Sequence, residues 1–189
     1  MFAEPPPAAA WRHRDARAGF EVLRSTRTGG GWTLHGVTTA VEDGTPWAVE
    51  YVIDVDDDWH TRGAEIVHPI EGRRVSLRRD GPGRWLVDGL HVPELDGCLD
   101  VDLESSAMTN ALPVHRLRLA VDETADAPAA YVRAADLTVS RLDQTYRRLP
   151  DAERHQRYYY DAPAFDYTAC LVYDETGFVL EYPGLAVRV

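Results

Sequence analysis

Apolar and polar residues alternate along much of the chain, with the period of two that is typical of half-buried β-strands. The clearest example is residues 47–53, where Trp47, Val49, Tyr51 and Ile53 occupy every second position. Side chains of a strand point alternately to the two faces of a sheet, so one face of this segment is expected to be buried. Similar patterns predict strands at residues 19–27, 32–41, 64–68, 73–79, 84–87, 98–103, 115–121, 165–173 and 178–182.

Glycine and proline mark turns between many of these segments. Residues 29–31 (GGG), 80–83 (DGPG) and 174–177 (DETG) supply the positive φ angles, or the fixed φ of proline, that tight turns need. The polar residues 141–157 are expected to form a short helix or a mobile loop, and residues 122–129 a surface loop. Short strands at this spacing predict an all-β fold: a single domain with a curved antiparallel sheet, a roll or an incompletely closed barrel.

The first ten residues differ in composition from the rest. Residues 1–10 form a Pro- and Ala-rich lead that we expect to be disordered, because three consecutive prolines fit neither a helix nor a paired central strand. We expect one β domain over residues 11–189, since a chain of 189 residues can bury roughly 70% of its unfolded surface. The lead lacks the basic and apolar parts of a signal peptide, and no apolar run could span a bilayer. These features predict a cytoplasmic protein without a transmembrane segment.

Charge and metal-ligand spacing exclude some classes of partner. A formal net charge of −11 disfavours nucleic acid as a partner. The sequence does not define the oligomeric state. The histidines show no H-x-x-x-H spacing and the cysteines no C-x-x-C spacing, so no zinc site and no cofactor are expected. Cys98 and Cys170 are expected to be reduced and buried, because the chain has no disulfide-rich pattern.

The most distinctive polar cluster lies near the middle of the chain. Asp100, Asp102 and Glu104 share one face of a predicted strand. Three acids on one face are compatible with a solvated surface, a concave polar site or ligation of a hard cation. If residues 115–121 form the paired strand, Arg116 could make a cross-strand ion pair with Asp100 or Asp102.

Aromatic and amide side chains offer a second kind of candidate chemistry. Residues 158–160 (YYY) could form an aromatic platform for sugar rings, or could simply pack on both faces of a strand. Gln144 and Tyr146 share a strand face if their segment is extended, and a glutamine amide can both donate to and accept from sugar hydroxyls. They could equally satisfy buried backbone groups.

Residues 97–103 (GCLDVDL), 109–113 (TNALP) and 116–117 (RL) together resemble the central signature of the bacterial putative glycolipid-binding family. Ala107 and Met108 depart from this pattern, in which a proline and an aromatic residue precede the Thr-Asn pair. The resemblance implies a single β-rich domain, with a curved and incompletely closed sheet similar in shape to bacterial lipid-carrier half-barrels. It extends over other motifs, at residues 51–54, 84–89, 144–146, 157–158, 172–174, 177–179 and 182–185.

The function implied by this resemblance is non-enzymatic binding of an amphiphilic small molecule, such as a glycolipid, in the concave face of the sheet. No catalytic residue is assigned. One alternative is an enzyme that acts on a sugar or phosphate conjugate with Asp100, Asp102 and Arg116; another is a structural domain without a pocket. The candidate ligand-binding residues are Asp100, Asp102, Thr109, Asn110, Arg116, Gln144, Tyr146 and Tyr158.

Overall fold

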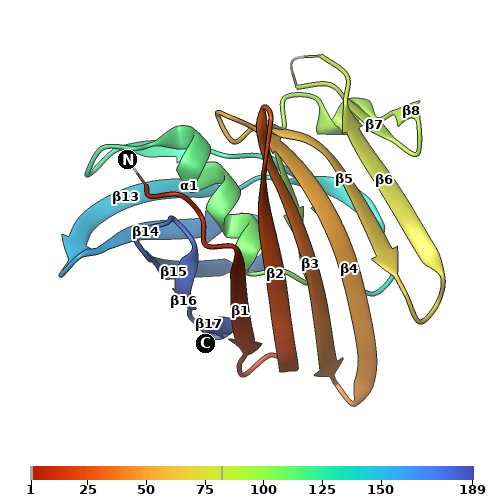
Figure 1. The fold of residues 1–189 in the computed structure, drawn as a ribbon, viewed down its shortest axis with the longest axis horizontal. Helices are drawn as coiled ribbons and strands as arrows, with labels where there is room; N and C mark the ends of the chain where they lie inside the picture. The colour runs from red at the N-terminus through yellow and green to blue at the C-terminus, as the bar shows by residue number, and fades with distance from the viewer. Residues whose placement is uncertain (1, 82) are drawn as a thin grey trace.

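One large sheet dominates the computed structural model, which describes residues 2–81 and 83–189 (Figure 1). Strands make up 57% of the chain and helices 9%, which confirms the all-β prediction. All neighbouring strands of this sheet are antiparallel. In spatial order they are β10 (Thr124–Asp126), β13 (Thr145–Ala152), β14 (His155–Ala162), β15 (Tyr167–Tyr173), β16 (Val179–Tyr182), β17 (Ala186–Arg188), β1 (Ala8–His13), β2 (Ala18–Thr28), β3 (Gly31–Glu42), β4 (Thr45–Asp56), β5 (Thr61–His68), β6 (Arg73–Arg79), β7 (Trp85–Val87) and β8 (Leu90–His91).

The sheet is curved but remains open, because the edge strands β8 and β10 are not paired with each other in the described part of the chain. Within it, β2 to β6 follow each other as antiparallel neighbours close to the predicted positions. The alternating residues 47–53 lie in β4, where the side chains of Trp47, Val49, Tyr51 and Ile53 are buried. No helix between residues 2 and 189, leaving aside residue 82, has both the length and the apolar character to cross a membrane.

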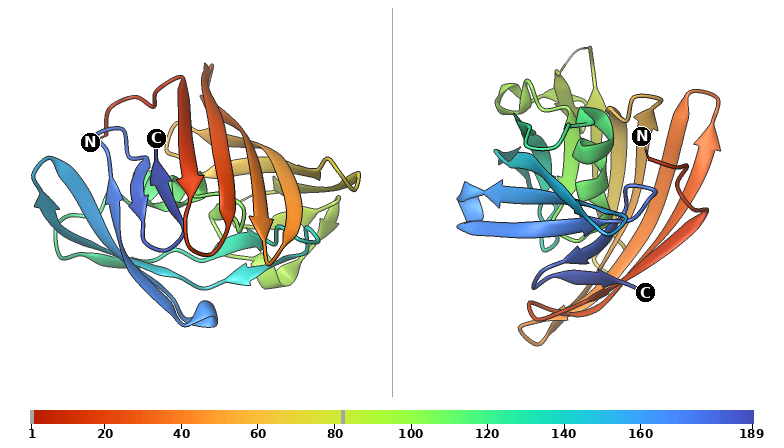
Figure 2. Two further views of the ribbon diagram at one scale, coloured as in Figure 1. Left: turned by 90° about the horizontal axis from the view of Figure 1, so that it is seen from below. Right: turned by 90° about the vertical axis from the view of Figure 1, so that its left-hand side faces the viewer.

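The hollow of the sheet is filled by a second group of elements, seen inside the curve in Figure 2. A small sheet has the order β12 (Val139–Leu142), β11 (Ala129–Val132), β9 (Asp100–Leu103), and β9 runs parallel to β11. After β9 come the 3₁₀-helix η2 (Met108–Asn110) and the helix α1 (Ala111–Leu117). We call residues 100–117 the plug. Its apolar side chains belong to the same core as those of the large sheet, so the middle of the concave face is covered; these side chains are Val101, Leu103, Met108, Ala111, Leu112 and Val114. Two further 3₁₀-helices are η1 (Pro93–Leu95) and η3 (Pro163–Phe165).

The strand predicted at residues 115–121 is wrong, because this part of the chain contains the end of α1 followed by irregular backbone. All five residues from Ala111 to His115 are buried, so the first part of this helix is enclosed on every side and does not show a single core-facing stripe. Pro113 is tolerated because it lies in the first turn, where its missing N–H has no helical partner. Seven residues are too few for a 3.6-residue period to stand out.

Other segments also differ from the expectation. Residues 141–157 contain the end of β12, all of β13 and the start of β14, rather than a short helix or a mobile loop. Residues 122–129 include the edge strand β10. Strand β1 begins at Ala8, so the last three residues of the expected disordered lead are paired in the sheet. The N–H of Ala3 also donates to the carbonyl of Glu175, at 2.8 Å.

Candidate ligand-binding pocket

The acids of β9 are not a solvated surface. The exposed fractions of Asp100 and Asp102 are 1% and 9%, whereas Glu104, just beyond the strand, is exposed. All four residues of β9 are buried. The strand pairs with β11 along one edge, and η2 and α1 pack against it. A buried carboxylate needs a partner for its charge or its hydrogen bonds. The two aspartates meet this need differently.

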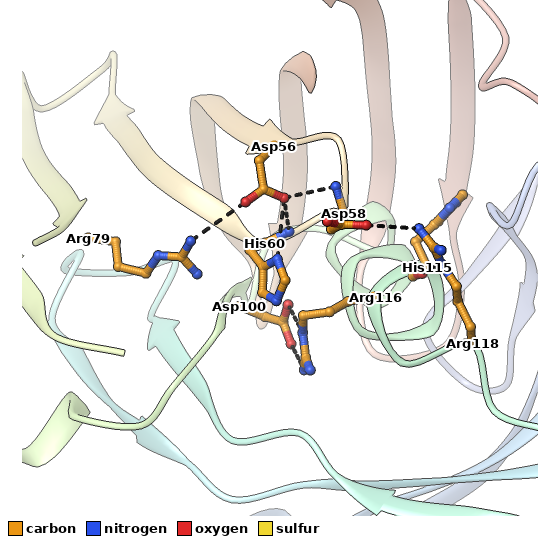
Figure 3. A network of polar contacts seen from close by, with 8 residues as sticks. All are labelled: Asp56, Asp58, His60, Arg79, Asp100, His115, Arg116 and Arg118. Carbon is orange, nitrogen blue, oxygen red and sulfur yellow. Dashed lines mark hydrogen bonds and ion pairs between the residues drawn. The ribbon is translucent and has the colours of Figure 1, made fainter. Parts of the chain in front are cut away.

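Asp100 forms a buried ion pair with Arg116 (Figure 3). Arg116 donates from Nε to Oδ1 at 3.0 Å and from Nη2 to Oδ2 at 2.5 Å, in the bidentate geometry that suits a guanidinium and a carboxylate. Burial raises the pKa of Asp100, and the hydrogen bonds and charge of Arg116 oppose that shift. The pairing predicted from the sequence is therefore present, although Arg116 comes from a helix instead of a neighbouring strand.

A second polar group lies beside this pair, on the loop between β4 and β5 (Figure 3). Asp56 accepts hydrogen bonds from the backbone N–H groups of Asp58 and His60, at 3.0 and 2.9 Å. Arg79 approaches the other oxygen of Asp56 at 3.7 Å. These contacts hold the loop in place. Asp100 and Arg116 thus belong to a network of internally paired charges.

Asp102 has no ionic partner among the described residues. Its Oδ1 accepts a hydrogen bond from the hydroxyl of Thr109 at 2.7 Å. Burial raises the pKa of Asp102 to about 6, with the Thr109 hydrogen bond opposing and the charge of Asp100 reinforcing the shift. Asp102 also lines a cavity.

That cavity has a volume of about 250 Å³ and lies at the end of the plug nearest the β1–β2 turn. We call it the tyrosine pocket. The rings of Tyr160, Tyr167 and Tyr182 contact one another, with centroids 5.9–6.2 Å apart, and the ring of Tyr131 lies 5.3 Å from that of Phe165. The wall contains five aromatic and four charged side chains: Tyr131, Tyr160, Phe165, Tyr167, Tyr182, Arg17, Glu42, Asp102 and Glu104.

A buried glutamate fixes the loop that forms one wall of the tyrosine pocket. Glu21 of β2 accepts hydrogen bonds from the hydroxyl of Tyr51 at 2.6 Å, from the hydroxyl of Ser106, and from the backbone N–H of Ala107 at 2.7 Å. Burial raises the pKa of Glu21, and these hydrogen bonds oppose the shift. Because Ser106 and Ala107 line the pocket, Glu21 ties this wall to the large sheet.

The other predicted residues are divided between this pocket and distant places. Asn110 lines the tyrosine pocket, and its Oδ1 accepts a hydrogen bond from the hydroxyl of the fully buried Tyr146 at 2.9 Å. Gln144 is buried beside a separate shallow cavity. Tyr158 lies toward the opposite end of the sheet, and its hydroxyl donates to Gln156 at 3.2 Å. The pocket therefore contains Asp102 and Asn110, with Thr109 behind Asp102.

A second cavity, of about 430 Å³, lies at that opposite end. We call it the N-terminal pocket, because residues 2–5 form part of its wall. Phe2 contacts the ring of His115, which stacks on Trp59 with centroids 3.6 Å apart. This cavity is the larger, but its arginines are matched by neighbouring acids: Arg27 with Asp57 at 2.7 Å, and Arg118 with Asp58 at 3.3 Å. Glu4 also lines it, and no ion pair with Glu4 is found among the described residues.

The aromatic wall of the tyrosine pocket was not predicted as a unit. Alternation along β14 turns Tyr158 and Tyr160 inward and leaves Tyr159 40% exposed, so residues 158–160 do not form one platform. Tyr131, Tyr167 and Tyr182 come from three other strands. These tyrosines are far apart in the sequence, and only the strand order brings them to the same cavity.

No group of three or more His, Cys, Asp or Glu side chains is placed to hold a metal ion in the part of the chain that the structure describes. Cys98 is buried, as expected, whereas Cys170 is only half-buried. In β15 the neighbours Ala169 and Leu171 point into the core, which turns Cys170 to the other face.

Both cysteines are free, so two thiols should react with a chromogenic disulfide reagent after denaturation without reductant. In the native protein we expect one faster thiol, Cys170, and one slow thiol, Cys98. Burial raises the pKa of Cys98 to about 11, despite the opposing charge of Arg141, and the reactive thiolate is therefore rare at pH 8. Absorbance recorded over time after the reagent is added measures the reaction rate of each thiol. A denatured protein without reactive thiols would contradict the free state of both cysteines.

Together, the fold and the pocket define an all-β protein in which an open antiparallel sheet surrounds a plug and leaves a small tyrosine-lined cavity at one end. The family described as putative glycolipid-binding matches residues 8–188, and the chain belongs to this family. The crystal structure of a DUF1089 family protein from Pseudomonas aeruginosa is similar over 100% of this chain and 96% of that chain, with a TM-score of 0.75 and 30% sequence identity. Comparison with curated proteins gives no match.

Proposed function

We propose that this protein binds an amphiphilic small molecule, such as a glycolipid, by its polar head group in the tyrosine pocket, and that it catalyses no reaction. The observation that carries the proposal is Asp102, a buried carboxyl group without an ionic partner that faces a cavity walled by tyrosines. Tyrosine combines an apolar ring with a polar hydroxyl and so suits sugar rings. The description of the family as putative glycolipid-binding supports the same class of ligand.

The size of the cavity favours a head group over a whole lipid. Its 250 Å³ lies just below the range of about 300–1,000 Å³ that is usual for drug-sized ligands. The middle of the concave face is covered by the plug, so we place the site at the end of that face. Phe165 lines the pocket and is 52% exposed. We propose that the apolar part of the ligand leaves the pocket along this ring.

The enzymatic alternative has less support. In that hypothesis Arg116 stabilises developing negative charge. The Nε and Nη2 edge of its guanidinium already binds Asp100, and neither Arg116 nor Asp100 lines the tyrosine pocket. A structural domain without a pocket is also less well supported, because a cavity with an incompletely paired acid is present.

Calorimetric titration with octyl glucoside, below its micellar concentration, tests the proposal. Tyr160→Leu should weaken binding about tenfold, since losing one ring contact of roughly 1.4 kcal/mol has this effect. Tyr159→Leu, on the outer face of the same strand, is the matched control and should bind like the wild type. Because Tyr160 is buried, the exposed Phe165→Ala provides a second test with little risk to folding. Wild-type binding by folded Tyr160→Leu and Phe165→Ala variants would remove the pocket from the function.

We also propose a cytoplasmic location, which the two free cysteines support, because disulfides are rare in that reducing compartment. Fractionation of host cells followed by immunodetection tests this. Recovery in the membrane or periplasmic fraction would contradict it.

A further inference from the structure

We propose that the tyrosine pocket selects a cationic head group, namely one with a protonated amine, such as an amino sugar. This inference rests on the proposed function and narrows it from amphiphiles in general to those with an ammonium group. It is carried by the balance of charges on the wall, by the surroundings of Asp102 and by the aromatic rings.

The charged wall has an excess of acids. Glu42, Asp102 and Glu104 line the pocket together with a single cation, Arg17. The guanidinium of Arg17 is part of this wall: it donates to the carbonyl oxygen of Glu104 at 2.8 Å and lies over the ring of Trp47, 5.2 Å from its centroid. Its charge interacts with Glu42 and Glu104, and one cation against three acids leaves the acids in excess. Among the described residues, no ion pair includes any of these four side chains, and the pocket therefore has a net negative wall.

Asp102 lacks a cation on every side. Its Oδ1 accepts from Thr109, and a hydrogen bond from the backbone N–H of Leu103 also lowers its pKa, but no ion pair to Asp102 is found within residues 2–81 and 83–189. A buried carboxylate in this state is costly unless a ligand supplies a donor or a positive charge. Arg17 lines the same cavity, but it is not among the main influences on the pKa of Asp102. The groups whose charges oppose that of Asp102 are acids and phenols: Asp100, Glu104, Tyr131, Tyr146, Tyr160, Tyr173 and Tyr182. A phosphate or carboxylate head group would add to this repulsion, whereas an ammonium group would remove it.

The aromatic wall favours the same charge. The face of an aromatic ring carries negative potential and attracts a cation within about 6 Å of its centroid. Tyr160, Tyr167 and Tyr182 form a continuous wall of three rings next to Asp102. A neutral hydroxyl could satisfy the hydrogen bond to Asp102, but only a cation gains from both the carboxylate and the rings.

Two probes that differ in one group separate these cases: octyl glucoside and octyl 2-amino-2-deoxyglucoside, titrated by calorimetry at pH 6.5. At this pH Asp102 is mostly ionised, because its pKa is about 6, and an amine with a pKa near 7.7 is mostly protonated. We expect the amino glucoside to bind at least about tenfold more tightly. In Asp102→Asn this preference should fall to less than threefold, and in the wild type it should shrink at pH 5, where Asp102 is mostly protonated.

General attraction of an ammonium group to an acidic protein is the effect to exclude. Asp80→Asn removes one exposed carboxylate at a site far from the pocket and should keep the full preference. Loss of preference in Asp80→Asn, or equal binding of both probes to the wild type, would overturn the cationic inference while leaving head-group binding intact. If neither probe binds the folded wild type, the proposed function fails as well.

Discussion

Arg116→Ala is expected to lower the free energy of unfolding by about 3–5 kcal/mol at pH 7, one of the two largest effects that we expect from a single change in this protein. The reason is Asp100, whose exposed fraction is 1% and whose two oxygens both accept from Arg116. Removing the guanidinium leaves a buried carboxylate without a counter-charge. Urea denaturation followed by circular dichroism measures the loss.

The double variant Asp100→Leu/Arg116→Leu is the matched control, because it removes both charges and leaves neither partner unpaired. It should recover most of the stability that Arg116→Ala loses, since apolar replacement of a whole buried pair is often neutral. The loss in Arg116→Ala should also shrink as the pH falls, because burial raises the pKa of Asp100 and the carboxyl group becomes neutral on protonation. A single variant within about 1 kcal/mol of the wild type at pH 7 would show that Asp100 does not depend on this pair.

Strand β4 was predictable because its buried side is aliphatic or aromatic. In β13 and β14 the alternation is also present, but one inward position is Arg148, which lies over the ring of Tyr158 with 5.3 Å to its centroid. A charged residue at a buried position hides the strand pattern. α1 was missed for another reason: it has only seven residues, and five consecutive ones, from Ala111 to His115, are buried, so no apolar stripe with a period of 3.6 residues appears.

The predicted site was partly correct for a reason that lies in the strand period. Asp100 and Asp102 occupy the same face of β9, two residues apart, so the sequence treats them alike. The structure separates them: Asp100 meets Arg116 from α1, while Asp102 meets Thr109 from η2 and faces the pocket. That difference depends on how the plug folds back, which no local pattern encodes. The sequence could not distinguish the internally paired acid from the one that faces the cavity.

Asp102→Asn is expected to raise the free energy of unfolding at pH 7.5. The folded pKa of Asp102, about 6, lies above its value of 3.8 in an unfolded chain, so the folded state binds the proton more tightly. Stability from this group is present below about pH 4 and is lost as the pH rises through 6. The pKa of Asp102 in the folded state is about two higher than in the unfolded chain, which corresponds to about 3 kcal/mol. An asparagine never ionises and therefore avoids that loss of stability. Urea denaturation of both proteins between pH 3.5 and 7.5 measures the difference.

The advantage of Asp102→Asn should be small at pH 3.5 and should grow between pH 4 and 7, because only the wild type changes charge at this position. Asp80→Asn, which removes an exposed carboxylate, should stay within about 0.5 kcal/mol of the wild type throughout. A variant that is less stable than the wild type at pH 7.5 would mean that the ionised Asp102 is well compensated in the folded state. If Asp102→Asn instead gains stability and loses the preference for an amine, the carboxylate of Asp102 contributes to binding and destabilises the folded state.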